Sequence, residues 1–310
     1  MLTGILAGLA AGALWGLVFV VPRMVPGLSA VDIAAGRFVS FGLVSALAML
    51  FVLRTRRRPT LNQALAALGL SVLGFTGYYL LLALAIQDAG TEVPTLIIGV
   101  IPIWMMLLGK PSALKWGALV PGLVLTAAGL GLMMVGNALP GPVASGAGLG
   151  TGFERAPHAP QYWRGLAYAL AAMVSWTAFG LINSAWLKRH PEVNATDWAN
   201  WLGVATGAGA LLLWFAAGSD QKVLLALEDR AWLAAICIAT GVGSAWVATI
   251  LWNLASQRLS ASLCGQLIVA ETVFALVYSY AWDAQWPTQI QLTACVLFVL
   301  GILASIRAHR

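Results

Sequence analysis

Hydrophobic residues follow one another along the chain in ten continuous stretches and do not alternate with polar residues. The stretches cover residues 3–21, 33–53, 64–87, 92–109, 114–135, 163–187, 197–217, 231–254, 259–281 and 287–306. A bilayer core about 30 Å thick needs roughly 20 apolar residues for each helical crossing. Continuous apolar runs favour helices over the alternating strands of a membrane barrel. The pattern therefore predicts an all-α integral membrane protein with ten transmembrane helices.

The composition supports a lipid environment for most of the chain. Hydrophobic residues make up 60% of it and charged residues 9%, whereas a soluble domain has about 45–50% and about 25%. So few charges cannot cover a surface that faces water, which excludes a soluble enzyme and a nucleic-acid-binding protein. The three cysteines all lie in apolar stretches and form no disulfide or metal framework.

The distribution of Lys and Arg predicts the orientation. If the N-terminus is cytoplasmic, eleven basic residues fall in cytoplasmic segments, five fall in external segments, and Arg37 lies within the second stretch. Cytoplasmic loops of membrane proteins carry the excess of positive charge. We therefore expect both termini in the cytoplasm.

The chain divides into two halves around a segment rich in Gly, Pro and Ala. We expect a first five-helix repeat at 1–136, an external linker at 137–162 and a second five-helix repeat at 163–310. An offset of 161 residues pairs Trp15 with Trp176 and four other identical positions. Since five is odd, the second repeat must be inverted relative to the first, and inverted repeats recur in secondary transporters. The glycine-rich run 146–152 has no strand before it, so a linker is favoured over a nucleotide-binding loop.

Several features of the chain resemble a known family. Besides the ten short spans and the 5+5 repeat, these are Pro102 in the middle of the fourth span and Ala-x-Gln at 85–87 and 255–257. They resemble the drug/metabolite transporter superfamily and, within it, the EamA-type exporters, most closely the YddG-type aromatic amino-acid exporters. The fourth helix of each repeat in that family often carries a Glu-Pro pair, which here is divided between Ile101-Pro102 and Glu271-Thr272. The resemblance implies export of small metabolites across a bacterial inner membrane.

Aromatic residues at mid-membrane depth are the main candidates for a substrate site. Trp15 and Trp176 are repeat counterparts near the middle of their spans, and with Phe19, Tyr78 and Tyr79 they would form an aromatic-walled cavity. Such walls suit amphipathic or aromatic solutes and attract ammonium groups. For each ring alone core packing is favoured, whereas for the set a cavity and core packing are equally consistent with the sequence. The expected substrate-binding residues are Trp15, Phe19, Tyr78, Tyr79, Pro102, Trp163, Trp176, Asn183 and Glu271.

Two ionisable residues lie inside predicted spans. Glu271 lies near the bilayer centre, where a charge is costly. It would bind a substrate ammonium or carry a coupling proton; the alternative is a neutral carboxyl group hydrogen-bonded to Gln266 or Asn253. Arg37 lies near the external end of its span, so we expect it to extend outward to the interface rather than bind a substrate carboxylate.

Two features of the helices themselves have both a structural and a functional interpretation. Gly4, Gly8, Gly12 and Gly16 form one ridge of small residues, expected to be a close packing seam, with a sliding surface in gating as the alternative. Pro102 removes a helical hydrogen bond, which predicts either a simple kink or a broken helix that offers carbonyl groups to a substrate.

The sequence thus predicts a secondary transporter that exports small metabolites, above all aromatic or hydrophobic amino acids, by alternating access through a central midplane cavity. It carries no ATP-binding loop, hydrolase motif or metal-ligand cluster, so we expect no enzyme activity, cofactor or metal. The expected partners are an amino-acid substrate and the lipid bilayer, with a monomeric chain and no nucleic acid. The alternatives are a proton-coupled exporter of drugs or lipophilic cations and, more remotely, a membrane enzyme or scaffold. Residues 220–230 are expected to form a short amphipathic helix at the outer interface.

Overall fold

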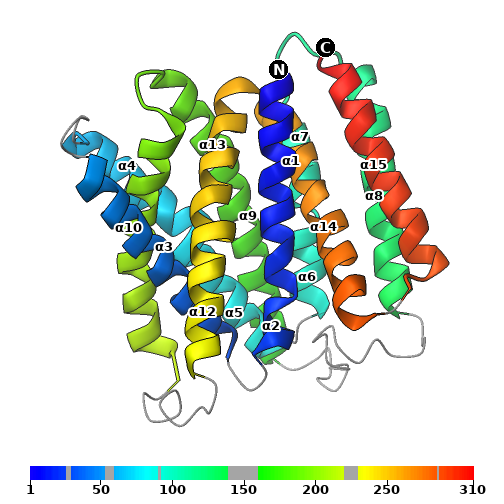
Figure 1. Ribbon diagram of the computed structural model, residues 1–310. Helices are drawn as coiled ribbons and strands as arrows, with labels where there is room; N and C mark the ends of the chain where they lie inside the picture. The colour runs from blue at the N-terminus through cyan, green and yellow to red at the C-terminus, as the bar shows by residue number, and fades with distance from the viewer. Residues whose placement is uncertain (26–28, 53–58, 90–91, 139–159, 220–229, 285) are drawn as a thin grey trace.

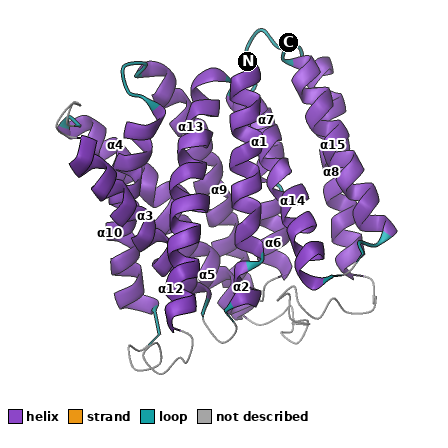
Figure 2. Ribbon diagram, viewed as in Figure 1, coloured by secondary structure: helices purple, strands orange, loops and turns teal. Residues whose placement is uncertain are grey.

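A computed structural model describes the chain except for residues 26–28, 53–58, 90–91, 139–159, 220–229 and 285 (Figure 1). The described residues form helices and connecting loops, without strands (Figure 2). Within the described part of the chain, nine helical segments are long and apolar enough to cross a membrane, and Pro94–Leu108 is a shorter apolar helical segment. The predicted all-α membrane fold with ten crossings is confirmed, with a shortened fourth crossing.

The first half contains five crossings, and two of them are interrupted. The third crossing has a π-helical turn in its middle, and the fourth is divided into two helices. The elements are α1 (Leu2–Gly16) with a 3-10 turn at Leu17–Phe19, α2 (Val21–Met24), α3 (Ala30–Val52), α4 (Leu61–Ser71), a π-helical segment (Val72–Thr76), α5 (Gly77–Ala89), α6 (Glu92–Gly99), α7 (Ile101–Leu108) and α8 (Trp116–Ala138).

The second half repeats the π-helical turn in its third crossing, but its fourth crossing is one continuous helix. Its elements are α9 (Pro160–Arg189), α10 (Ala195–Ala217), α12 (Arg230–Thr240), a π-helical segment (Gly241–Val247), α13 (Ala248–Arg258), α14 (Ala261–Asp283) and α15 (Gln289–Ala308). The helices α8 and α9 extend slightly into the predicted linker, whose residues 139–159 lie outside the described part, as do residues 220–229 of the predicted interfacial helix.

The first helix of each half packs against helices of the other half. The helix α1 packs against α13 and α14 of the second half, while α9 packs against α5, α6 and α7 of the first half. The corresponding helices α3 and α10 pack on each other, and so do α8 and α15. Both termini lie on the same face of the bundle (Figure 1). The arrangement is that of two inverted five-helix repeats, as the sequence predicts.

Pro102 accounts for the division of the fourth crossing. It has no backbone N–H and cannot continue the hydrogen-bond ladder of α6. Accordingly α6 ends at Gly99 and α7 begins at Ile101. The helix is interrupted at Val100, and a contact between its free carbonyl groups and a substrate stays a prediction.

Glycines allow the closest contacts between helices of different halves. The ridge on α1 packs along α14: a methyl group on Gly12 would lie 3.1 Å from the backbone nitrogen of Glu271, and one on Gly16 would lie 2.8 Å from that of Ala275. All four ridge glycines are buried, which is the geometry of a close packing seam. The helices α3 and α10 also cross closely, because a methyl group on Gly42 would lie 2.7 Å from the Cα atom of Gly207.

We expect Gly42→Ala to lower the thermal stability of the purified protein. Its methyl group meets the main chain of Gly207, which cannot turn away as a flexible side chain can, and such overpacking typically costs about 1–3 kcal/mol. Gly131→Ala in α8 is the matched control, because its methyl group would meet no atom within 4 Å. A melting temperature of Gly42→Ala equal to that of the control would contradict the close α3–α10 crossing.

Candidate functional site

Three tryptophans meet where helices of both halves converge. The ring centroid of Trp15 on α1 lies 6.4 Å from that of Trp176 on α9 and 5.3 Å from that of Trp252 on α13. Trp176 and Trp252 are 6.2 Å apart. Trp176 also packs against both of the two large hydrophobic cores of the bundle. The counterparts Trp15 and Trp176 are therefore brought together as predicted, and Trp252 is a third member that the sequence did not single out.

Arg37 points into the bundle and not toward the interface. Its side chain is only 7% exposed, and its Nη1 atom donates a hydrogen bond of 3.2 Å to the hydroxyl of Tyr79. The guanidinium carbon lies 5.0 Å from the ring centroid of Phe38 and 5.9 Å from that of Tyr79. The expected outward extension is wrong, because these two rings offer the cation both a hydrogen-bond acceptor and π faces. The Nε atom of Arg37 has no hydrogen-bond partner among the residues that the structure describes.

Glu271 lies about halfway along α14 and is half-buried. No ion pair or hydrogen bond joins its side chain to another described residue. Gln266 instead bonds to Thr126 and Ser305, and Asn253 to Asn183. The alternative of a carboxyl group hydrogen-bonded to Gln266 or Asn253 is therefore wrong, since both amides hold other helices together.

Glu271 and Arg37 belong to different halves of the chain but influence each other electrostatically. Glu271 interacts electrostatically with Arg37 and with Tyr78. The ring of Tyr78 meets that of Tyr79 edge-on, with centroids 5.5 Å apart, and Tyr79 in turn bonds to Arg37. Glu271 and Arg37 are thus within electrostatic reach of each other without an ion pair between them, and Tyr79 bonds to Arg37 with Tyr78 beside it.

Other predicted site residues lie elsewhere. Phe19 is 55% exposed at the end of the first crossing, and Trp163 is 58% exposed and packs edge-on against Tyr162. Neither joins the tryptophan cluster. Asn183 is fully buried: its amide nitrogen donates to Asn253 Oδ1 at 3.1 Å, and its Oδ1 atom accepts from Trp198 Nε1 at 2.7 Å. Both of its polar groups therefore serve helix packing, and its predicted contact with a substrate has no support in this geometry.

The face that carries the termini is closed where α7, α9 and α14 meet. Met105 of α7 is fully buried there. A methyl group on Gly180 would lie 2.7 Å from its Sδ atom, and one on Gly265 would lie 2.5 Å from its Cβ atom. Next to it, the backbone nitrogen of Ser262 donates a hydrogen bond of 3.1 Å to the carbonyl oxygen of Gly109. The methionine and this bond close the bundle between the site and the termini.

On the opposite face an ion pair joins the two halves. Arg164 at the start of α9 donates from Nε and Nη2 to the two carboxylate oxygens of Asp88 at the end of α5, at 2.7 and 2.9 Å. The contact is a bidentate one, the geometry in which such pairs are strongest. It fixes the outer ends of α5 and α9 to each other.

Sequence comparison assigns the chain to a family. The pattern of the EamA-like transporter family matches residues 2–136 and 163–307. The chain belongs to this family. It is therefore a multi-pass membrane transporter, which agrees with the expectation that it is not an enzyme.

Two further similarities extend over nearly the whole chain. "Inner membrane protein YtfF" of Escherichia coli (strain K12) is 32% identical over 321 residues, covering 99% of this chain and 96% of that protein. A solved crystal structure matches 98% of both chains with a TM-score of 0.71 and 19% sequence identity. At that identity the second similarity supports the fold alone.

Proposed function

We propose that this EamA-like transporter exports aromatic or hydrophobic amino acids. The observation that carries the proposal is the carboxylate of Glu271, which has no ion-pair or hydrogen-bond partner among the described residues, in the same site as the buried guanidinium of Arg37. An α-amino acid carries one ammonium group and one carboxylate group on the same carbon atom. It would place its ammonium group at Glu271 and its carboxylate at Arg37.

The membrane environment favours a solute whose two charges are opposite to those of Glu271 and Arg37. Isolated charges inside a membrane are costly and mark substrate or ion pathways. In this site a zwitterion would supply each of the two protein charges with an opposite charge, and the Nε atom of Arg37, which no described residue bonds, would supply a further donor. A solute with only one charge would leave the other protein group uncompensated.

The tryptophans support a preference for aromatic side chains. Trp15 and Trp176 are half-buried, and their rings meet nearly perpendicularly, at 80°. Aromatic rings prefer such edge-to-face contacts and offset stacking, which contribute about 0.5–1.5 kcal/mol beyond the area that they bury. A substrate ring beside these tryptophans would gain the same contacts.

We further propose that transport proceeds from the cytoplasm by alternating access across a bacterial inner membrane. The location is supported by the similarity to a protein named for the inner membrane, and cytoplasmic termini are supported by the excess of Lys and Arg on that side. The two inverted repeats would rock against each other about the shared site. One chain contains both halves, so a monomer suffices.

A proton-coupled exporter of lipophilic cations is the second candidate. A carboxylate without a partner among the described residues is also what a proton carrier or a cation site requires. The buried Arg37 argues against this candidate, because it would repel a cation.

Counterflow in proteoliposomes tests the proposal. We expect the purified protein to exchange labelled phenylalanine saturably without a pH gradient, and unlabelled tryptophan or leucine to compete. Transport of tetraphenylphosphonium that requires a pH gradient, with no amino-acid exchange, would support the second candidate instead. If neither solute moves while the protein remains folded, a scaffold or enzyme becomes the better explanation.

A further inference from the structure

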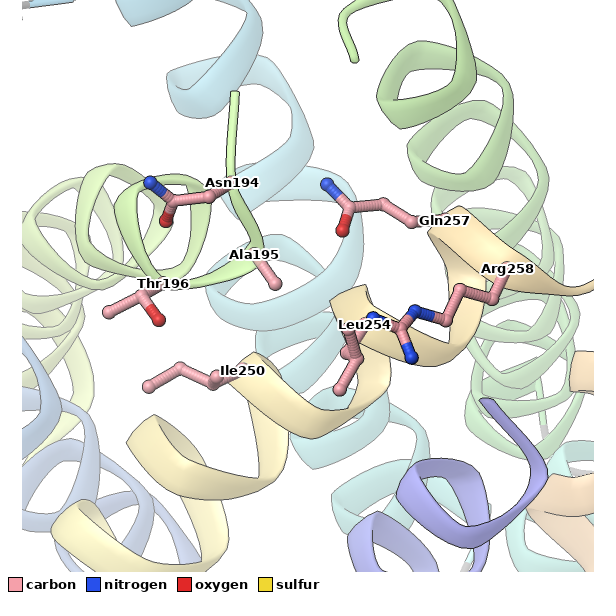
Figure 3. Close-up of a pocket in the computed structure, with 7 residues that line it drawn as sticks. All are labelled: Asn194, Ala195, Thr196, Ile250, Leu254, Gln257 and Arg258. Carbon is pink, nitrogen blue, oxygen red and sulfur yellow. The ribbon is translucent and has the colours of Figure 1, made fainter. Parts of the chain in front are cut away.

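A pocket lies away from the central site, on the face that carries the termini. It has a volume of about 430 Å³ and lies between the start of α10 and the end of α13 (Figure 3). Its lining residues are Asn194, Ala195, Thr196, Ile250, Leu254, Gln257 and Arg258. Because both helices cross the membrane, the pocket lies near the level of the lipid headgroups.

One wall of the pocket combines an apolar surface with a cation. Ile250, Leu254 and Arg258 are four residues apart on α13 and so share one helix face. The exposed Arg258 forms no ion pair or hydrogen bond with another described residue. Figure 3 shows its guanidinium group turned back beside Leu254 and not extended away from the helix end. The cation therefore lies directly above the apolar surface.

The other wall supplies hydrogen-bond donors. The first backbone N–H groups of a helix have no acceptor within the helix, and Ala195 and Thr196 are the first two residues of α10. The hydroxyl of Thr196 bonds to no other described residue. The side chain of Asn194 caps the start of α10 and is not available to a ligand. Its Oδ1 atom accepts from the backbone nitrogen of Asp197 at 2.8 Å, and its Nδ2 atom donates to the side-chain carboxylate of Asp197 at 2.6 Å.

We propose that this pocket binds an anionic phospholipid of the leaflet on the termini side. The phosphate would lie between Arg258 and the start of α10, and an acyl chain would cover Ile250 and Leu254. A molecule with an anion at one end and a hydrocarbon chain at the other matches both walls, whereas inorganic phosphate would leave the apolar wall uncovered. The site is independent of the central charges and of the substrate transported.

Native mass spectrometry of the delipidated full-length protein tests this proposal with phosphatidylglycerol and phosphatidylcholine as probes. We expect the first phosphatidylglycerol to bind about five-fold more tightly than phosphatidylcholine, because each basic residue near a membrane surface contributes about 1 kcal/mol toward anionic lipid. Arg258→Gln is expected to remove this preference. The control Arg307→Gln changes an exposed arginine on the same face, at the end of α15, and is expected to retain it.

Further variants distinguish a specific loss of lipid binding from a loss caused by misfolding. The Cβ atom of Arg258, which lies close to Gly4, is kept in Arg258→Gln. Thr196→Val is a second variant on the opposite wall; we expect it to weaken phosphatidylglycerol binding with an unchanged melting temperature. Leu254→Trp should also weaken binding, by filling the acyl groove. Equal affinities in Arg258→Gln and Arg307→Gln would overturn the proposal. So would displacement of the lipid by an equal concentration of inorganic phosphate, which would make free phosphate the ligand.

Discussion

Phenylalanine counterflow is expected to fall by about 30-fold or more when Glu271 is replaced by glutamine. The substitution keeps the size of the side chain and removes its charge, so a bound ammonium group loses its counter-ion within the membrane. Removing one partner of a buried, hydrogen-bonded charge pair costs about 2–5 kcal/mol. Initial rates in proteoliposomes measure the effect, and some residual counterflow should persist because Arg37 and the tryptophans are unchanged.

A comparison of competitors shows whether the ammonium group is what Glu271 contacts. The analogue 3-phenylpropanoate lacks that group, so it should compete weakly with phenylalanine in the wild type and lose little further affinity in Glu271→Gln. Glu192→Gln is the control, because Glu192 is an exposed loop residue near the termini. If Glu271→Gln retained full counterflow but lost only transport driven by a pH gradient, Glu271 would be a proton carrier and not an ammonium site.

The second large effect is expected for Arg37→Gln, which should also slow phenylalanine counterflow by about 30-fold or more. Here the substrate carboxylate loses its counter-ion, and the hydroxyl of Tyr79 loses the donor that it has at 3.2 Å. Arg37→Lys should restore only part of the rate, because an ammonium group lacks the planar fork of donors that a carboxylate accepts from. The measurement is the same counterflow assay.

The matching competitor for Arg37 is 2-phenylethylamine, which lacks the carboxylate. It should lose less affinity than phenylalanine when Arg37 is replaced. Arg189→Gln, at the exposed end of α9, is the control and should transport normally. If both analogues lost affinity equally in both variants, Arg37 and Glu271 would maintain the shape of the site. They would not bind the two charged ends of a zwitterion.

The crossings were predictable because the bilayer imposes one simple condition on each of them. About 20 apolar residues are required whatever the neighbours are, so the long stretches 163–187 and 197–217 correspond to α9 and α10 with few boundary errors. The fourth crossing is shorter because Pro102 divides it, and that interruption was also visible in the sequence.

The details of the site depend on contacts between the two halves, which no local pattern encodes. Trp252 has no tryptophan counterpart in the first repeat, so the duplication that points to Trp15 and Trp176 does not reveal it. The inward direction of Arg37 depends on Tyr79 of another helix. Its distance from the end of its own helix suggested the opposite direction.

The π-helical segments are a further feature that apolar periodicity missed. Each one lies in the third crossing of its half, at Val72–Thr76 and Gly241–Val247. A single wider turn changes the register of the residues that follow, and Tyr78 and Tyr79 come directly after the first segment. Such turns are frequent at functional sites. The two tyrosines therefore owe their orientation to a turn that hydrophobicity alone cannot reveal.

The closure on the termini face has an energetic consequence for the transport cycle. Among the described residues, the bond from Ser262 to Gly109 is the only main-chain hydrogen bond between the two halves. When α7 and α14 separate, water can solvate both groups, so the net loss is about 1 kcal/mol. Side-chain packing between α7 and its neighbours, including Met105 between its two glycines, must then supply the rest of the resistance to opening. A thioether with three rotatable bonds adapts readily to a changing gap, so the same residue would permit fast switching and still exclude solvent when the gate is shut.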